Sequence, residues 1–206
     1  MSERLRVTLN GLDLATPVLA ASGCYGYGVE YAEVADPRYL GGFITKSVSP
    51  VRWAGNPPPR LCEVGSGLIN SIGLANMGVK EFAETVVPQY AGLETRKIVS
   101  IAGKVQDDYL AVVDRLEQVE GIDGYELNIS CPNVKEGGMA FSQNPDVTEN
   151  MVKRVRMISK RWITAKLTPN VASVADGAKA AQEGGADAVS LINTLVGMAV
   201  DWRSRR

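Results

Sequence analysis

The sequence contains no histidine among its 206 residues, and this absence narrows the chemistry available to the chain. It excludes a Ser-His-Asp triad, a Cys-His dyad and any metal site built on imidazole groups of this chain. A group that accepts a proton here must therefore be a cysteine, a lysine, a tyrosine or a carboxylate. The sequence also lacks a GxGxxG or Walker pattern, so it offers no familiar nucleotide-binding loop.

Cysteine is scarce as well, and the charges nearly balance. The three cysteines lie far apart, which suggests neither a disulfide framework nor a CxxC metal site. The net charge of −1 gives no reason to expect a nucleic-acid or anionic-membrane partner. No apolar run approaches the roughly 20 residues that span a bilayer, and residues 1–6 lack the apolar core of a signal peptide. We therefore expect a cytoplasmic protein without a metal site.

Short apolar runs alternate along the chain with segments of helical periodicity. Strands are expected at residues 17–21, 42–46, 97–102, 124–129, 162–167 and 187–192. Helices are expected at residues 29–35, 79–90, 105–119 and after the predicted caps Asn144 and Ser173. Asn10-Gly11 suits the turn of an N-terminal hairpin, and the proline-rich residues 50–59 predict a loop. This order indicates a parallel sheet with helices outside it.

A closed barrel and an open doubly wound sheet both satisfy this order. Polar residues stand at the carboxyl ends of most expected strands, namely Ser22, Lys46, Asn128, Lys166 and Asn193. A barrel brings all its strand ends to one site, whereas an open sheet uses mainly two. The pattern therefore favours an α/β fold of the (β/α)8 TIM-barrel type. Because such a barrel usually takes about 250 residues and about six βα units are counted, we expect residues 1–206 to be a single barrel domain without its C-terminal units.

The loop after the fourth expected strand contains a cysteine, Cys131. A thiol of lowered pKa at this place could accept a proton from a ligand. The alternative is a buried structural thiol, which is the role that we expect for Cys24 and Cys62. The glycine pair at 137–138 would let this loop open and close over a ligand.

Lysine and asparagine side chains stand at several of the same strand ends. Lys46 and Lys166 each close an apolar strand, which suggests ligand binding; the alternative is a salt bridge or a side chain that reaches solvent. Several asparagines at strand ends or in nearby loops would suit a planar polar ligand, although any one of them could cap a turn. These asparagines are Asn70, Asn128, Asn133 and Asn193.

Several motifs together make the sequence resemble the class 1 dihydroorotate dehydrogenases over essentially its whole length. The most specific are Asn-Ile-Ser-Cys-Pro-Asn at 128–133 and Asn-Ser-Ile-Gly-Leu-Ala-Asn at 70–76. Gly-Asn-Pro-Pro-Pro-Arg at 55–60 and Cys-Pro-Asn-Val-Lys-Glu-Gly-Gly at 131–138 look like subfamily 1B. In that subfamily an FMN barrel is paired with an electron-transfer subunit that carries FAD and a 2Fe-2S cluster, and electrons pass to NAD. Subfamily 1A uses fumarate instead.

The resemblance implies oxidation of (S)-dihydroorotate to orotate in de novo pyrimidine (UMP) biosynthesis. The hydride would pass to FMN N5, and the C5 proton would pass to Cys131 as the catalytic base. The enzyme would be a homodimer at the core of a heterotetramer with the iron-sulfur FAD subunit. The family continues with two further βα units that bind the FMN phosphate, so the chain is expected to be truncated. The alternatives are a fumarate-linked class 1A enzyme, another FMN barrel acting on a related pyrimidine, or an inactive fragment.

The resemblance also carries over two overlapping sets of ligand contacts. The FMN contacts would be Ser22, Lys46, Ser47, Ser100, Asn128, Lys166 and Ile192. The substrate contacts would be Lys46, Asn70, Ser71, Ile72, Gly73, Leu74, Asn128, Asn193 and Thr194. Ser100 departs from the family, whose members often carry asparagine at this position. Because a serine reaches less far than an asparagine, the resemblance is weaker at this flavin contact.

Overall fold

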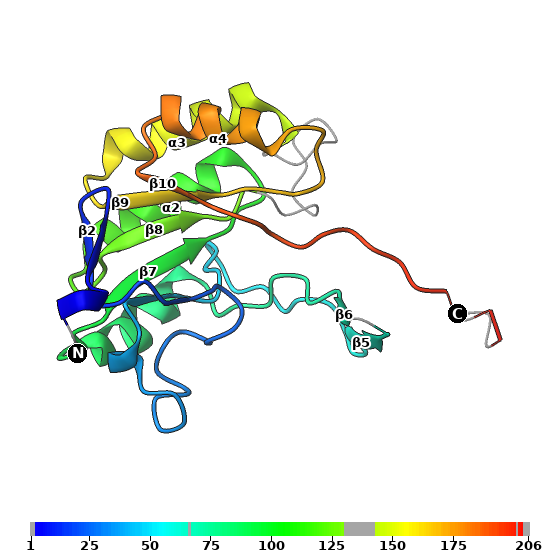
Figure 1. Ribbon diagram of the computed structural model, residues 1–206, viewed down its shortest axis with the longest axis horizontal. Coiled ribbons are helices and arrows are strands. Elements are labelled where there is room, and N and C mark those ends of the chain that lie inside the picture. The colour runs from blue at the N-terminus through cyan, green and yellow to red at the C-terminus, as the bar shows by residue number, and fades with distance from the viewer. Residues whose placement is uncertain (1–2, 66, 130–142, 201, 204–206) are drawn as a thin grey trace.

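The computed structural model describes residues 3–65, 67–129, 143–200 and 202–203, and its centre is a curved parallel sheet (Figure 1). The sheet has six strands in the order β10-β9-β8-β7-β4-β3. The strands are β3 (Leu19–Ala20), β4 (Gly42–Ile44), β7 (Arg96–Ile101), β8 (Gly124–Leu127), β9 (Trp162–Lys166) and β10 (Ala188–Ser190). The order of these strands across the sheet is also their order along the chain, as in consecutive βα units of a barrel. The predicted fold class is therefore confirmed.

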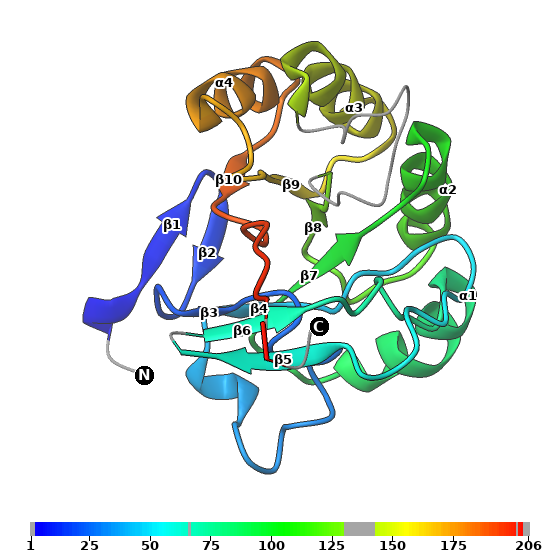
Figure 2. The same cartoon turned by 90° about the vertical axis from the view of Figure 1, so that its right-hand side faces the viewer.

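Among the described residues, four helical segments cover the outer face of the sheet (Figure 2). They are α1 (Val79–Glu81), which continues as a π-helical turn (Phe82–Val86) and a 3-10 turn (Val87–Tyr90), α2 (Gln106–Glu117), α3 (Pro145–Ile158) and α4 (Val174–Glu183). Short 3-10 turns also occur at Glu3–Leu5 and Pro37–Tyr39. Two antiparallel hairpins complete the described elements, namely β1 (Val7–Leu9) with β2 (Leu12–Leu14), and β5 (Leu61–Val64) with β6 (Gly67–Asn70). Within the described part of the chain, none of the helices combines the length and the apolar character needed to cross a bilayer.

The two faces of the sheet differ in their chemistry. Apolar side chains such as Val99, Tyr125 and Ile163 are buried in the main core beneath the helices. The inner face begins apolar, because Ile98 and Trp162 pack there against the β1–β2 hairpin in a second cluster. One layer toward the carboxyl ends, Ser100 lies opposite Glu126, and Glu126 lies opposite Thr164. The inner face thus changes from apolar to polar toward the carboxyl ends of the strands.

Local sequence signals predicted most of these elements. The N-terminal hairpin turns at Asn10 and Gly11, whose φ angles of 41° and 85° are those that an Asn-Gly turn provides. Helix α3 begins after Asn144, whose side chain accepts a hydrogen bond of 3.0 Å from the Asp146 amide. Helix α4 also begins after its predicted cap, Ser173, but this side chain makes no capping hydrogen bond. The position of the α4 cap was therefore predicted correctly and its capping interaction was not.

The predicted helix at residues 29–35 is wrong, because this segment forms a series of turns. The Glu30 carboxylate accepts hydrogen bonds from the backbone amides of Tyr27, at 2.7 Å, and Val29, at 3.3 Å. The Tyr25 hydroxyl donates to the Ala35 carbonyl. These side chains satisfy backbone groups locally and so compete with a helical hydrogen-bond ladder.

The β5–β6 hairpin was not predicted, since none of the expected strands lies within residues 61–70. Leu61 pairs with Asn70 and Val64 with Gly67 in an antiparallel register. The hairpin extends away from the central sheet (Figure 1), and its Leu61 and Leu68 side chains are exposed. Because this hairpin buries no apolar face in the core, its sequence lacks the alternation of apolar and polar residues that identifies a half-buried strand.

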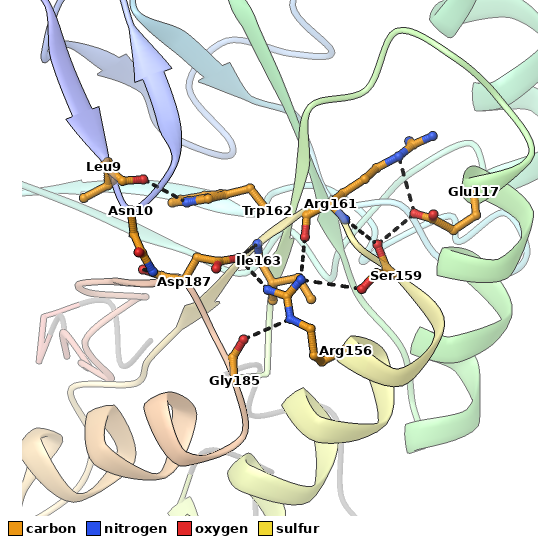
Figure 3. Close-up of polar contacts among 10 residues, drawn as sticks. All are labelled: Leu9, Asn10, Glu117, Arg156, Ser159, Arg161, Trp162, Ile163, Gly185 and Asp187. Atoms are coloured by element: carbon orange, nitrogen blue, oxygen red, sulfur yellow. Dashed lines mark hydrogen bonds and ion pairs between the residues drawn. The ribbon is translucent and has the colours of Figure 1, made fainter.

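An arginine cluster joins helix α3 to the amino ends of β9 and β10 (Figure 3). The Arg156 guanidinium donates to the carbonyl oxygens of Gly185, at 3.0 Å, and Arg161, at 2.8 Å, and forms an ion pair with Asp187. The same carboxylate accepts a 2.8 Å hydrogen bond from the Ile163 amide. The cluster therefore holds two strand ends and a helix end in one arrangement.

Replacing Arg156 by alanine is expected to lower the free energy of unfolding by about 2–4 kcal/mol, because several backbone acceptors and the Asp187 carboxylate lose a charged donor. Arg154→Ala is the matched control. Arg154 lies on the same helix, but its ion pair is with Asp107, which is 79% exposed. We expect that variant to lose less than about 1 kcal/mol. Urea unfolding measures both changes, and equal losses would contradict the structural role of Arg156.

Tyr90 is buried and is expected to make the protein sensitive to alkali. Its hydroxyl donates a 2.6 Å hydrogen bond to the Tyr27 carbonyl. Burial, with a smaller contribution from the Glu30 charge, raises the pKa of Tyr90 well above its usual value. Above about pH 10 the unfolded chain releases this proton while the folded chain keeps it, so the free energy of unfolding falls as the pH rises.

The free energy of unfolding is expected to fall by about 1.4 kcal/mol per pH unit above the pKa of Tyr90 in the unfolded chain. Tyr90→Phe removes the titrating group, so this variant should lose about 1 kcal/mol less than the wild type between about pH 9 and about pH 11. Tyr39→Phe is the control, since Tyr39 is exposed. Urea unfolding at each pH tests the prediction, and parallel pH profiles for the wild type and Tyr90→Phe would refute it.

Candidate functional site

Four polar side chains meet at the carboxyl ends of the parallel strands and form one hydrogen-bonded chain. The Asn128 amide nitrogen donates to the Ser47 hydroxyl at 3.0 Å, and the Ser47 and Ser100 hydroxyls lie 3.0 Å apart. The Asn193 amide nitrogen donates to the Asn128 side-chain oxygen at 2.8 Å. We call Ser47, Ser100, Asn128 and Asn193 the strand-end network. It unites residues in or after β4, β7, β8 and β10, which confirms the predicted convergence for these strands.

Asn128 is the centre of this network and is fixed from several sides. It is 7% exposed, and its backbone amide donates to the Ile101 carbonyl at 2.9 Å. The Tyr109 hydroxyl from α2 donates to the Asn128 carbonyl at 2.8 Å. A side-chain amide has two donor hydrogens and two acceptor lone pairs, and Ser47 and Asn193 engage one of each. The remaining donor and acceptor suit the edge of a planar polar ligand.

A buried carboxylate beneath this network was missed by the sequence analysis. Glu126 is 1% exposed, and its Oε1 atom has no hydrogen-bond partner among the residues that the structure describes. The Lys166 ammonium lies 3.9 Å from this oxygen. Burial raises the pKa of Glu126 above its usual value, while the Lys166 charge and hydrogen bonds from Ser190 and Ser100 oppose the rise. The available signal was an acidic residue in an apolar strand, two positions before Asn128 and so on the same face.

The ends of β3 and β4 meet next to the strand-end network. The Ser22 hydroxyl donates a 2.8 Å hydrogen bond to the Thr45 carbonyl, and the Thr45 hydroxyl accepts one of 3.1 Å from the Ser100 amide. Lys46 is half-buried, and its backbone amide donates to the Gly26 carbonyl at 2.7 Å. The predicted residues Ser22 and Lys46 therefore belong to the same end of the sheet as Ser100.

The predicted substrate run from Asn70 to Leu74 belongs to a different segment, at the base of the β5–β6 hairpin. The Asn56 side-chain nitrogen donates to the Ser71 carbonyl and hydroxyl, both at 2.9 Å, and the Asn56 backbone amide donates to the Ile72 carbonyl at 3.0 Å. Leu74 has a φ of 52°, which is unusual for a branched side chain and indicates a conformation imposed by its surroundings. These contacts connect the run to the loop at 55–60 rather than to the parallel strands.

The remaining predicted site residues differ in how well the structure places them. Thr194 and Ile192 are exposed after β10, and the Thr194 amide donates to the Asn193 side-chain oxygen at 2.8 Å. Cys131 and Asn133 lie outside the described residues. Cys24 and Cys62, which were expected to be buried, are exposed. Within the described ranges, the acidic and cysteine side chains form no group that could hold a metal ion.

The composition of the strand ends fits a planar, partly anionic cofactor such as a flavin. The strand-end network supplies hydroxyl and amide groups, and the Lys166 side chain, which is 14% exposed, supplies a positive charge beside them. The unpartnered Glu126 oxygen means that the ammonium is drawn to the carboxylate without being held by a hydrogen bond. A cationic group of this kind remains able to approach a ligand.

Comparison with known proteins gives a consistent result. A family model described as dihydroorotate dehydrogenase matches residues 4–206. The chain is 46% identical over 202 residues to the dihydroorotate dehydrogenase B (NAD(+)) catalytic subunit of Alkaliphilus metalliredigens, covering 98% of this chain and 67% of the relative. It is 42% identical over 202 residues to the protein of the same name from Bacteroides thetaiotaomicron, with the same coverage of both chains. A relative from Solibacter usitatus, named for the fumarate-linked type A, is 43% identical over 206 residues, covering 100% of this chain and 68% of the relative.

Proposed function

We propose, from the premise that this chain belongs to the dihydroorotate dehydrogenase family, that it oxidises (S)-dihydroorotate to orotate in pyrimidine biosynthesis. The strand-end network is the observation that carries this proposal. It presents the edge of the Asn128 amide that Ser47 and Asn193 leave unused, and Lys166 ends the neighbouring strand β9. Both residues lie at the end of the sheet where barrel enzymes bind their ligands. Such a combination suits a substrate with a planar ring amide and a carboxylate.

The cofactor in this proposal is FMN, which accepts the hydride from the substrate when it is bound. The residues that would hold it share a place at or after the strand ends and offer hydroxyl, amide or ammonium groups, with one apolar contact. They are Ser22, Lys46, Ser47, Ser100, Asn128, Lys166 and Ile192. Their contacts with one another keep several of these groups in place before any ligand arrives, which lowers the entropic cost of binding.

Side chains of this protein would orient the substrate, accept its proton and stabilise the charge that develops on it. Asn128 and Asn193 would orient the pyrimidine ring, since each of their amides is already fixed by the other. Cys131 would accept the C5 proton, and Lys46 would stabilise negative charge that develops on the substrate. The Asn70–Leu74 run and Thr194 would complete the substrate contacts, with closure of the glycine-containing loop after Cys131 excluding water.

The electron acceptor in this proposal is NAD, reached through a partner subunit. The sequence motifs at 55–60 and 131–138 resemble subfamily 1B, and the Alkaliphilus relative is named as an NAD-linked catalytic subunit. The partner would carry FAD and a 2Fe-2S cluster, and a homodimer of the catalytic subunit would form the core of a heterotetramer. The second candidate is fumarate as the acceptor, which the name of the Solibacter relative favours.

Anaerobic mixing of the FMN-loaded protein with dihydroorotate tests the proposal. Dihydroorotate is expected to bleach the flavin absorbance in a single turnover, whereas dihydrouracil, which lacks the carboxylate, should not. Reoxidation by fumarate alone would favour the second candidate, and a requirement for the partner subunit and NAD would favour the first. A protein that binds FMN but is reduced faster by dihydrouracil than by dihydroorotate would refute the proposed substrate.

A further inference from the structure

Glu126 occupies the polar layer of the inner sheet face, where the register determines its neighbours. Ser100 and Thr164 lie directly opposite it on the two adjacent strands. Lys166 stands two residues beyond Thr164 on β9, so both side chains project to the same face, and Ser190 lies opposite Lys166. The carboxylate is thus surrounded by hydroxyl groups and one ammonium, at the centre of the sheet.

This environment is unfavourable for a carboxylate that serves only to stabilise the fold. Within the described ranges its Oε1 atom is buried without a hydrogen bond, and Lys166 at 3.9 Å is its ion-pair partner. A pair at this separation repays little of the cost of removing two charges from water. Elsewhere in the protein, the Glu117 Oε1 atom illustrates a structural role. It accepts hydrogen bonds from Tyr125 at 2.7 Å and Ser159 at 2.9 Å and lies 3.4 Å from Arg161. The Ser100 and Ser190 hydroxyls near Glu126 leave its Oε1 atom without such a bond among the described residues.

We propose that Glu126 is a positioning residue, which holds the Lys166 ammonium at the mouth of the barrel and partly offsets its charge toward the bound flavin. The inference rests on the proposed function, because it takes FMN as the ligand beside Lys166. At a separation of 3.9 Å from the carboxylate, the ammonium is able to move toward the cofactor, and its attraction to the carboxylate limits this movement. In this proposal Glu126, which is 1% exposed, acts through Lys166 and not by direct contact with the cofactor or the substrate.

Replacing Glu126 by glutamine keeps the size of the side chain and removes its charge. The Lys166 ammonium then acts on the flavin without an offset, so the negative charge gained on reduction is more strongly stabilised. We expect the ratio of reduced to oxidised flavin at a fixed ambient potential to increase about tenfold, which is a rise of about 30 mV for a two-electron couple.

A double-mutant cycle on the FMN-loaded protein tests this mechanism, with dithionite and a reference dye reporting the midpoint potential. Without Lys166 the buried carboxyl takes up a proton, so Glu126→Gln should change the potential in the wild type but not in a Lys166→Met background. A purely structural role for Glu126 would shift the potential equally in both backgrounds. Glu117→Gln is the matched control and should leave the potential unchanged. Its carboxylate pairs with Arg161, which precedes β9, whereas Lys166 stands at the other end of this strand (Figure 3).

Dithionite reduces the flavin without substrate, so the two proposals fail in different ways. If dihydroorotate does not reduce the wild type but the cycle shows the expected coupling, the proposed substrate is wrong and the role of Glu126 stands. If dihydroorotate reduces the wild type and Glu126→Gln leaves the potential unchanged, the inference about Glu126 is overturned. A shift of the same size in the Lys166→Met background also overturns it.

Discussion

Replacing Cys131 by alanine is expected to leave FMN bound and to slow its reduction by dihydroorotate by about 10²–10⁴-fold, the usual contribution of a positioned general base. The chain contains no histidine that could take over the proton. The rate of flavin bleaching after anaerobic mixing measures the loss. The amount of flavin that remains with the protein after gel filtration checks that binding is intact.

Cys62→Ala is the control for this experiment. Cys62 is an exposed cysteine on β5, so its replacement should change the reduction rate by less than about twofold. A serine at position 131 is expected to retain the shape of the side chain but to remain slow, because a hydroxyl is a much weaker acid than a thiol. Reduction of Cys131→Ala at the wild-type rate would remove Cys131 from the mechanism.

Asn128→Ala is expected to lower kcat/KM for dihydroorotate by about 10²–10³-fold. The change removes the amide that links Ser47 to Asn193, so the Ser47 hydroxyl loses a donor and the Asn193 amide nitrogen loses an acceptor. Each unsatisfied buried group costs about 1–3 kcal/mol, and each 1.36 kcal/mol that is lost from transition-state stabilisation is a factor of ten in rate. Steady-state kinetics with an artificial electron acceptor gives kcat and KM separately, without requiring the partner subunit.

Asn150→Ala is the matched control for the network, because Asn150 lies on the outside of α3 and donates to Gln106 at 3.0 Å. This variant is expected to keep kcat/KM within about twofold of the wild type. A thermal unfolding scan of both variants separates lost orientation from lost folding. A folded Asn128→Ala enzyme with wild-type kcat/KM would contradict the central role of this amide.

The fold class and several site residues were predictable because their signals are local. Apolar runs such as β7 and β9 alternate with the amphipathic periodicity of α2 and α3, and these patterns specify buried strands and covering helices. A polar residue that ends a buried strand, such as Asn128 or Lys166, requires no tertiary information to be noticed. Because parallel strands have a common direction, their carboxyl ends must face the same side, and this topology brought Asn128 and Asn193 together.

The errors have a physical reason as well. The turns at 29–35 replace the predicted helix because side chains take the place of helical hydrogen bonds. The Glu30 carboxylate accepts from the Tyr27 backbone amide, and the Tyr25 hydroxyl donates to the Ala35 carbonyl. The β5–β6 hairpin buries too little apolar surface to leave a pattern in the sequence. Both elements depend on contacts whose geometry cannot be deduced from propensity alone.

The sequence by itself determined the family, the βα order and the identity of the polar strand ends, since each depends on residue type, spacing or direction along the chain. Only the tertiary structure decided which of those residues touch. It joined Ser47, Ser100, Asn128 and Asn193 into one network, left the Asn70–Leu74 run with the hairpin, and placed Glu126 beside Lys166. The reason is that strand register, which sets the neighbours across a sheet, arises from the packing of the whole core and not from any one segment.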